Sequence, residues 1–370
     1  MAAQTHKSTR KYEILTGLIL LGLTFGVFLL GEIGLRAIQY ARFGVEKAVE
    51  TSSAFYKDDE SGIRLIKPNQ QLGNVRINNL GYRGPDISLD KPRDTIRFLF
   101  LGSSTTYDAN SIEGKNWPHM TVNLLSQVFP KCSFDFINAA QPGFGTEQIQ
   151  KLYEAKLQKV NADFTIILPG DINQDLDWLG TQQGFSSIHY IPSALAEYSV
   201  LWAKVEMNSR IIKLQRRAFS RVGKVNLDLP AIQDRFRERI SDLIKHLRDG
   251  DTTVLTVKIG SQLRTGQNKE HQIKTANTAL FYMPNIALPD LIAAREGYNA
   301  VIDELAIRED FDVINSSLNV PANRLHYSDT VHFTTQGSKV MAEALVKEIS
   351  EIPRFKMHLQ DRGCTHYDSQ

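Results

Sequence analysis

Short apolar segments alternate with longer helical segments along most of this 370-residue chain. Such alternation is typical of a parallel sheet, because each strand of a parallel sheet needs a crossover, usually a helix, before the next strand begins. The sequence therefore predicts an α/β fold with three layers, α/β/α, around a parallel sheet. The expected strands cover 96–101, 133–137, 164–168, 252–258 and 311–315, and the expected helices cover 117–129, 146–160, 231–248, 290–308 and 335–350.

An uncharged, mostly apolar run extends from Ile14 to Gly31 and continues past Glu32 to Leu35. An α-helix needs roughly 20 such residues to cross the hydrocarbon core of a bilayer. The run is too long for a typical signal-peptide core, and no small-residue cleavage site follows it directly. The sequence predicts an uncleaved transmembrane anchor at 14–35 behind a cytoplasmic tail at 1–13, with a cleaved signal peptide as the alternative.

Charged residues flank the apolar run on both sides. Three basic residues precede it within the first eleven positions of the chain, and basic and acidic residues are mixed after it. The positive-inside rule then favours a cytoplasmic N-terminus, which makes the chain a single-pass inner-membrane protein with an exported, periplasmic-type domain. The residues concerned are Lys7, Arg10 and Lys11 before the run, and Arg36, Arg42, Glu46, Lys47 and Glu50 after it.

About 330 residues remain behind the anchor, enough for one extended α/β domain. Segment 36–95 is expected to be a connector and lead-in because prolines interrupt it, segment 96–352 to be the domain, and 353–370 to be a C-terminal tail. The stretch 180–230 is longer than this fold needs between its third and fourth strands. We expect it to be an insertion.

The insertion contains a run of basic residues that is opposed by a single acidic residue, Glu206. Apolar residues lie among them at mixed spacing, and the pattern predicts a basic amphipathic helix. Two interpretations are open: a solvated face of the domain, or a lid that contacts anionic lipid headgroups or an anionic polymer. The basic residues are Lys204, Arg210, Lys213, Arg216, Arg217, Arg221 and Lys224.

Two distant segments carry the groups of a nucleophilic site. The hydroxyl-rich segment Gly102–Thr106 follows the expected strand 96–101 at once, and open α/β sheets place their active sites at such strand ends. Near the C-terminus, Asp329 precedes His332 by three residues. An Asp at that spacing can hold the imidazole in one tautomer and leave its other nitrogen free to take a proton from a nucleophile.

The second and third expected strands run into loops that offer hydrogen-bond donors. The loop Asn138–Gly145 contains glycines, which let a backbone N–H approach a ligand closely, and Gly143 is the expected donor. The loop Pro169–Asp175 offers the side-chain amide of Asn173. Acyl transfer needs such donors, because attack on a carbonyl carbon creates an oxyanion.

In their order along the chain, these segments resemble the four blocks of the SGNH, or GDSL-like, hydrolase superfamily, which are named for Ser, Gly, Asn and His. The resemblance extends over residues 64–349 and implies a flavodoxin-like parallel sheet and ester chemistry through an acyl-serine. It assigns Ser104, Asp329 and His332 as catalytic residues, and Ser104, Gly143 and Asn173 as the oxyanion hole.

Membrane-anchored bacterial members of that superfamily begin with an Asn-x-x-Gly-Phe/Tyr-Arg segment, to which Asn78–Gly84 is similar. The chain departs from the usual pattern at two places. Ser103 stands where the superfamily usually has an Asp, and Gly170 and Asn173 are one residue further apart than in the usual Gly-x-Asn-Asp block.

Composition excludes several other classes of protein. The formal net charge of +2 argues against a dedicated nucleic-acid binder, and the chain has neither a Walker loop nor a dinucleotide fingerprint. Cys132 and Cys364 have no partners at metal-ligand spacing, and two cysteines make no disulfide framework. They can pair in an oxidising compartment, although the position of Cys132 beside a strand favours a buried thiol. We expect no cofactor and no metal.

Three functions from different classes remain. The resemblance implies a membrane-anchored serine ester hydrolase or O-acyl (acetyl) transferase that acts on carbohydrate or surface polysaccharide. The anchor and the basic helix favour a lipid esterase or lysophospholipase instead. The altered Asn block hints at a non-catalytic scaffold on a hydrolase fold.

Overall fold

The computed structural model describes residues 2–43, 54–185 and 191–364. The chain forms two compact units: an N-terminal unit of Met1–Val49 with Tyr190–Ile212, and a main unit of Glu50–His189 with Lys213–Gln370. Three groups of expectations fall outside the described residues: those for Glu46, Lys47 and Glu50, for 186–190 of the insertion, and for the last six residues of the expected tail.

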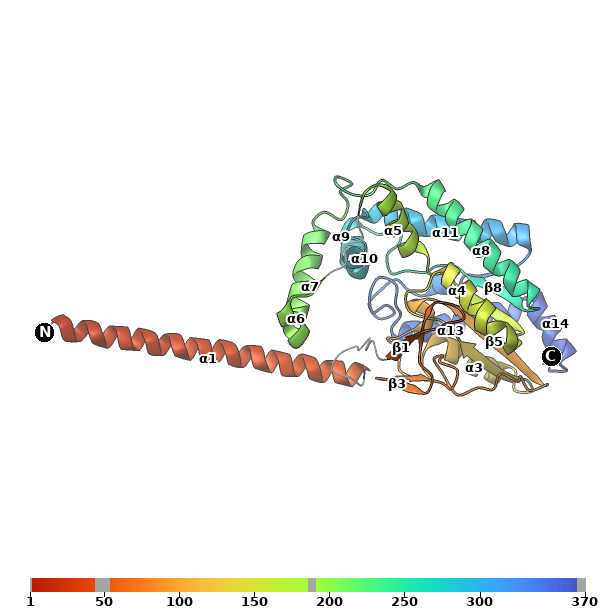
Figure 1. Ribbon diagram of the computed structural model, residues 1–370, viewed down its shortest axis with the longest axis horizontal. Helices are drawn as coiled ribbons and strands as arrows, with labels where there is room; N and C mark the ends of the chain where they lie inside the picture. Colours follow the sequence, from red (N-terminus) through yellow and green to blue (C-terminus); the bar gives the residue numbers. More distant parts are fainter. Residues whose placement is uncertain (1, 44–53, 186–190, 365–370) are drawn as a thin grey trace. The chain divides into compact units, whose positions relative to one another are not determined.

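The main unit is built on a five-stranded parallel sheet with the strand order β6-β5-β7-β8-β9 (Figure 1). Counted within this sheet alone, the order is 2-1-3-4-5, which is the flavodoxin-like order. The predicted α/β fold with a parallel sheet is confirmed. The strands are β5 (Thr95–Gly102), β6 (Ser133–Asn138), β7 (Phe164–Leu168), β8 (Thr253–Val257) and β9 (Asp312–Ile314).

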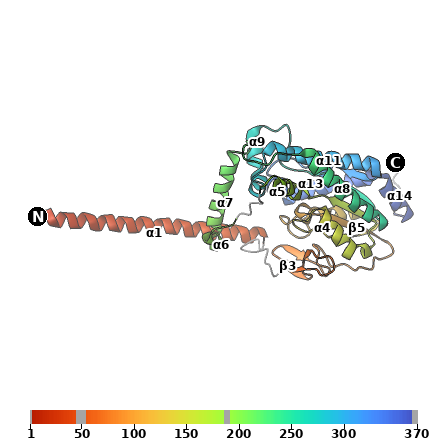
Figure 2. The same cartoon turned by 45° about the horizontal axis from the view of Figure 1, so that its top comes forward.

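Helices cover both faces of the sheet. All of β5 is buried, and its side chains alternate between two cores: Phe98 and Phe100 face one, Leu99 and Leu101 the other. This alternation follows from the two-residue repeat of a strand. Three helices pack in the first core: α3 (Trp117–Val128), α13 (Thr335–Glu351) and α14 (Pro353–Asp361). The second core includes residues of α4 (Thr146–Leu152), α5 (Ile172–Gln182), α8 (Leu229–Asp249) and α11 (Leu288–Glu309). There α8 and α11 run side by side (Figure 2).

One expected helix has a more varied backbone than the sequence predicts. The expected helix 146–160 is α-helical only in α4, and it continues as a π-helical turn at Tyr153–Leu157 and a 3₁₀ turn at Gln158–Val160. It ends at Asn161, whose φ of 52° is left-handed and stops a helix. The remaining short helices are α2 (Ser104–Tyr107), α6 (Ala194–Tyr198), α7 (Val200–Gln215), α9 (Lys269–Thr275), α10 (Asn277–Tyr282) and α12 (Ser316–Asn319).

The lead-in before the sheet folds into two small antiparallel hairpins. Isolated bridges join Ile77 to Arg83 and Arg83 to Asn138, the last residue of β6. These bridges attach the lead-in to the parallel sheet. The expected connector is therefore structured over its described second half. The hairpin strands are β1 (Phe55–Lys57) with β2 (Arg64–Ile66), and β3 (Gln70–Leu72) with β4 (Val75–Ile77).

Two sequence-based expectations are corrected by the structure. Segment 353–370 is not a tail over its described part, because α14 buries Phe355 completely and leaves Leu359 only 3% exposed. These two residues are four apart, so they lie on one face of the helix and pack in the core with α3 and α13.

The single basic helix expected over 204–224 is also wrong, since α7 ends at Gln215. Beyond it, Arg221 pairs with the buried carboxylate of Asp290, and Lys224 donates to the carbonyl of Ile286 at 3.0 Å. These two cations attach the chain to the main unit, so they do not belong to a helical basic face.

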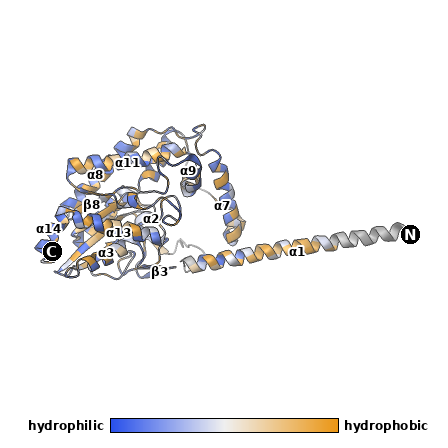
Figure 3. Cartoon of the chain, turned by 180° about the vertical axis from the view of Figure 1, so that it is seen from behind, coloured by the Kyte–Doolittle hydropathy of each residue, from blue (hydrophilic) through white to orange (hydrophobic). Residues whose placement is uncertain are grey.

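The N-terminal unit contains the long helix α1 (Ala2–Phe43). Its stretch Leu15–Ala41 has a mean hydropathy of 2.2 and no buried residues, and it is long and apolar enough to cross a membrane (Figure 3). Glu32 interrupts this apolar surface for a structural reason. Its carboxylate accepts the backbone N–H groups of Val200 and Leu201 at 2.9 and 2.8 Å, and thereby caps α7 within the same unit.

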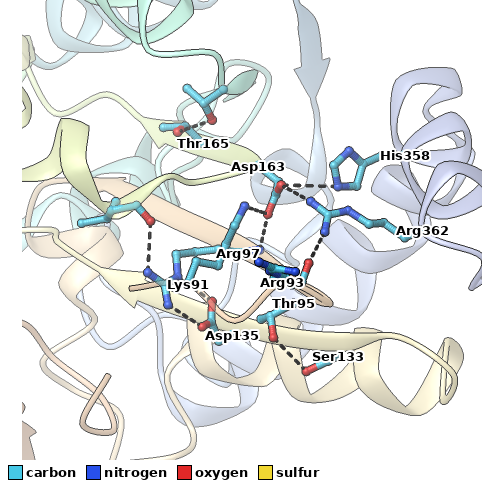
Figure 4. A network of polar contacts seen from close by, with 12 residues as sticks. Lys91, Arg93, Thr95, Arg97, Ser133, Asp135, Asp163, Thr165, His358 and Arg362 are labelled. Atoms are coloured by element: carbon cyan, nitrogen blue, oxygen red, sulfur yellow. Dashed lines mark hydrogen bonds and ion pairs between the residues drawn. The ribbon is translucent and has the colours of Figure 1, made fainter. Parts of the chain in front are cut away.

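A charged cluster stabilises the edge of the sheet where its strands begin (Figure 4). Arg97 is fully buried within β5, and its guanidinium pairs with Asp135 of β6 through two bonds of 2.8 and 2.7 Å. Asp163 accepts from Lys91 and from the Arg97 backbone, each at 2.7 Å. This arrangement explains why the otherwise apolar run of β5 tolerates an arginine.

Candidate active site

The segment after β5 places Ser104 at the opposite edge of the sheet. Gly102 ends the strand, and a Cβ atom at this position would lie 2.7 Å from the carbonyl oxygen of Leu168, so only glycine fits. Ser104 then begins the short helix α2 and remains half-buried. Because β5 lies between β6 and β7, Ser104 sits where the strand order reverses, the usual position of an open α/β active site.

The structure brings Ser104, His332 and Asp329 into one hydrogen-bonded line. The Nε2 atom of His332 lies 2.8 Å from Oγ of Ser104, and its Nδ1 atom lies 2.7 Å from Oδ2 of Asp329. The other carboxylate oxygen of Asp329 accepts the backbone N–H groups of Val331 and His332, both at 2.9 Å. The tight turn therefore fixes the carboxylate, and the carboxylate fixes the ring with Nε2 toward the serine.

The electrostatics of the turn favour an ionised carboxylate beside a basic imidazole. Burial acts to raise the pKa of Asp329, but the hydrogen bonds and charge of His332 outweigh burial, so this pKa lies below its usual range. Burial likewise acts to lower the pKa of His332, while Asp329 and, more weakly, Asp108 raise it above the ordinary 6.5. The ring thus has increased affinity for a proton delivered from Ser104.

The residues expected to bind an oxyanion border the same cavity as Ser104 and His332. The cavity has a volume of about 610 Å³ and is lined by Ser104, Gly143, Asn173 and His332, among others. Gly143 has a left-handed φ of 83°, and its carbonyl accepts the side-chain amide of Gln174 at 2.9 Å. Asn173 is exposed at the start of α5. All the loops expected at the site therefore meet at one edge of the sheet.

The two acidic residues beside Asn173 serve the packing of α5. Asp175 is fully buried and is bound by Arg239 at 2.6 Å and by the hydroxyl of Tyr298. Asp171 accepts the backbone N–H of Thr146 at 2.8 Å and thereby joins α4 to the start of α5. Both carboxylates are committed to helix contacts, which leaves the amide of Asn173 as the side-chain donor of this loop at the cavity.

Arg83 has a structural role at the site that the sequence did not reveal. Its buried guanidinium donates to the carbonyl oxygens of Tyr107, Asp108 and Ser111, at 2.8 Å for Tyr107 and 2.5 Å for Ser111. These three carbonyls belong to the last residue of α2 and to the loop that follows it. The motif Asn78–Gly84 marked this arginine, although no local pattern could show which carbonyls it would reach.

Asp108 connects the nucleophile segment to α13. Its Oδ2 atom accepts the hydroxyl of Ser338 at 2.6 Å and the backbone N–H of Trp117 at 3.1 Å. Burial raises the pKa of Asp108 to about 6, against the opposing effect of Arg83. Asp108 thus connects the starts of α3 and α13 to the loop behind Ser104, and nothing in the sequence singled it out.

Among the described residues, no group of three or more His, Cys, Asp or Glu side chains could hold a metal ion. The thiols of Cys132 and Cys364 are both free and buried, the arrangement that the sequence favoured. The Sγ atom of Cys132 lies 3.5 Å from the carbonyl oxygen of Cys364.

The chain matches no protein-family model and no curated protein sequence. Solved structures with a similar fold include the acetylxylan esterase Axe2 from Geobacillus stearothermophilus, at 12% identity and a TM-score of 0.43, over 68% of this chain and 93% of that one. They also include a lipolytic G-D-S-L family protein from Veillonella parvula, at 11% identity and a TM-score of 0.42, over 70% of this chain and all of that one. The strand order of the sheet, with the loops of the site at one of its edges, is that of a flavodoxin-like α/β fold.

Proposed function

We propose that this chain is a membrane-anchored serine ester hydrolase or O-acyltransferase. The observation that carries the proposal is the line from Ser104 Oγ to His332 Nε2 at 2.8 Å and from His332 Nδ1 to Asp329 Oδ2 at 2.7 Å. A serine hydroxyl is a poor nucleophile near neutral pH unless a positioned base removes its proton. The line supplies that base and a carboxylate to orient it, which favours an enzyme over a scaffold.

In the proposed reaction, Ser104 Oγ attacks the ester carbonyl while His332 takes the hydroxyl proton at Nε2. Asp329 stabilises the imidazolium and remains ionised. The backbone N–H groups of Ser104 and Gly143 and the amide of Asn173 bind the oxyanion, and one such donor is typically worth about 10²–10³ in rate. The imidazolium then protonates the leaving alcohol, and an acyl-Ser104 ester is left.

The second half of the reaction sets the choice between hydrolysis and transfer. His332 removes a proton from the incoming hydroxyl, which attacks the acyl-serine and releases Ser104. Water as the incoming group gives a carboxylic acid, and a sugar hydroxyl gives a new ester. The same residues serve both outcomes, and we propose carbohydrate as the acceptor or substrate from the resemblance to membrane-anchored members of the superfamily. A lipid ester is the second candidate, which the apolar helix α1 favours.

The decisive experiment measures p-nitrophenyl acetate hydrolysis by the detergent-solubilised full chain and by the Ser104→Ala variant. We expect Ser104→Ala to reduce turnover to background and to abolish labelling by a fluorophosphonate probe. Ser126→Ala is the matched control, because that hydroxyl only bonds its own helix through the carbonyl of Val122 at 3.0 Å. Full activity in Ser104→Ala, or equal labelling of both variants, would refute the proposed nucleophile.

A further inference from the structure

The cavity beside Ser104 and His332 has a single fixed charge. Among the described residues that line it, Arg295 is the one Lys, Arg, Asp or Glu side chain, and much of the remaining wall is apolar. The apolar residues include Leu168, Ile172, Ile259, Ala279, Met283 and Leu291. Arg295 lies on α11 and is only 7% exposed.

Arg295 has few protein partners compared with other buried arginines of the chain. Its Nη1 atom donates to the carbonyl of Leu263 at 2.8 Å, and its Nε atom has no partner. By contrast, Arg83 and Arg97 each donate to several carbonyl or carboxylate oxygens. A buried guanidinium that lacks partners is costly. Arg295 lines the cavity with one protein hydrogen bond from its Nη1 atom, so a ligand there can accept from the rest of the guanidinium.

Arg295 also lacks a direct ion pair. Among the described residues, no carboxylate forms an ion pair with its guanidinium, and Glu296 acts on its charge only at longer range. Burial lowers the pKa of Arg295 to about 10, which still leaves the group protonated near neutral pH. The cavity therefore carries one positive charge in mostly apolar surroundings.

We propose that the ester bound in this cavity carries a carboxylate, and that Arg295 binds it. A guanidinium recognises a carboxylate through paired N–H donors, and a single cation matches a single negative charge. The carboxylate can belong to the acyl part, as in a half-ester of a dicarboxylic acid, or to the alcohol part, as in a uronic acid. The proposal rests on the proposed ester chemistry and narrows its substrate to anionic esters.

The experiment compares pairs of esters of similar size with the full chain in detergent. One pair tests the acyl part: mono-4-nitrophenyl glutarate against 4-nitrophenyl pentanoate. The other tests the alcohol part: 4-acetoxybenzoate against 4-methylphenyl acetate. For each pair, the ratio of kcat/KM for the anionic ester to that for the neutral ester is measured in the wild type, Arg295→Met and Arg295→Lys.

We expect the wild type to favour the anionic ester in one pair, which identifies the part that bears the carboxylate. Arg295→Met should lower that ratio by about ten- to a hundredfold, as for a lost charge-assisted hydrogen bond, and Arg295→Lys should lower it less. Arg308→Met, which removes an exposed cation from the same helix, should leave the ratio unchanged.

Two results would overturn the assignment of Arg295: a wild type that prefers the neutral ester in both pairs, or a preference that survives in Arg295→Met. If Arg295→Met does not fold, the test rests on the wild type, in which the ratio of kcat/KM for the anionic ester to that for the neutral ester must exceed one in at least one pair. Failure of the ester chemistry itself looks different, because the wild type would then hydrolyse none of the four esters and would resist the fluorophosphonate probe.

Discussion

The imidazole of His332 lies between Oδ2 of Asp329, which accepts a hydrogen bond from a proton-bearing nitrogen, and Oγ of Ser104, which faces the other nitrogen. Asp329 holds a proton on Nδ1, and this leaves the lone pair of Nε2 directed at Ser104. The proposed function of the ring as a base thus depends on a turn only a few residues long, in which the backbone N–H groups of Val331 and His332 hold the carboxylate. This arrangement can be tested by measuring how kcat/KM depends on pH.

The raised pKa of His332 predicts where activity is lost in acid. A general base acts only when it is unprotonated, so kcat/KM should fall as pH drops through a value above 6.5. Asp329→Asn removes the charge and the hydrogen bond that raise this pKa. We expect the acid limb of the pH profile to move to lower pH and kcat/KM to fall by about 10³–10⁴. The exposed Asp59→Asn serves as the control, and an acid limb that stays in place in Asp329→Asn would contradict the assigned role.

Because Arg83 binds the carbonyls behind Ser104, its loss should lower the free energy of unfolding and also displace the proposed nucleophile. Arg83→Met leaves the carbonyls of Tyr107, Asp108 and Ser111 without their buried donor, and each unsatisfied group costs about 1–3 kcal/mol. We expect urea denaturation to show a loss of at least about 2 kcal/mol, together with slower fluorophosphonate labelling of Ser104. Arg93→Met, at an exposed side chain, should change the free energy of unfolding by less than about 0.5 kcal/mol. A fully stable Arg83→Met would show that the loop is held by other contacts.

At the scale of elements, two loops of the site are fixed by hydrogen bonds to the starts of helices. Asp108 bonds Ser338 at the start of α13, and Asp171 bonds Thr146 at the start of α4. The site therefore depends on helices that are packed against both faces of the sheet. The helix α14 belongs to this packing although it lies beyond the last strand and the last functional loop.

The contribution of α14 can be measured with two substitutions in the same helix. Phe355→Ala removes a fully buried ring, which contacts Phe98, Phe129 and Phe164, and should destabilise the main unit by about 3–5 kcal/mol. Met357→Ala removes a side chain that is 55% exposed, and it should change stability by less than about 0.5 kcal/mol. Thermal or urea unfolding distinguishes the two, and equal effects would mean that α14 is a peripheral tail after all.

At the scale of the whole molecule, the helix α1 exposes apolar side chains from Leu15 to Ala41. Burying such a surface in lipid is strongly favourable, and this apolar stretch of 27 residues exceeds the roughly 20 that a bilayer requires. We expect the full chain to stay with membranes after extraction with alkaline carbonate. A variant that lacks residues 1–41 should become soluble and keep the proposed esterase activity. A full chain that carbonate releases, or a truncated chain that still sediments with membranes, would contradict the anchor.

The sequence by itself determined the five strands of the parallel sheet, several of the helices beside it and the order of the loops, because these depend on patterns that are local in the chain. The apolar run of β5 and the segments Gly102–Thr106 and Ser328–Phe333 can be recognised without coordinates. Only the tertiary structure decided which distant groups meet. Ser104 and His332 are 228 residues apart, and the bond between them exists because parallel strands deliver their ends to one edge of the sheet. The carbonyl partners of Arg83, the burial of α14 and the unpaired Nε atom of Arg295 were decided in the same way, since side-chain surroundings depend on packing between elements rather than on local sequence.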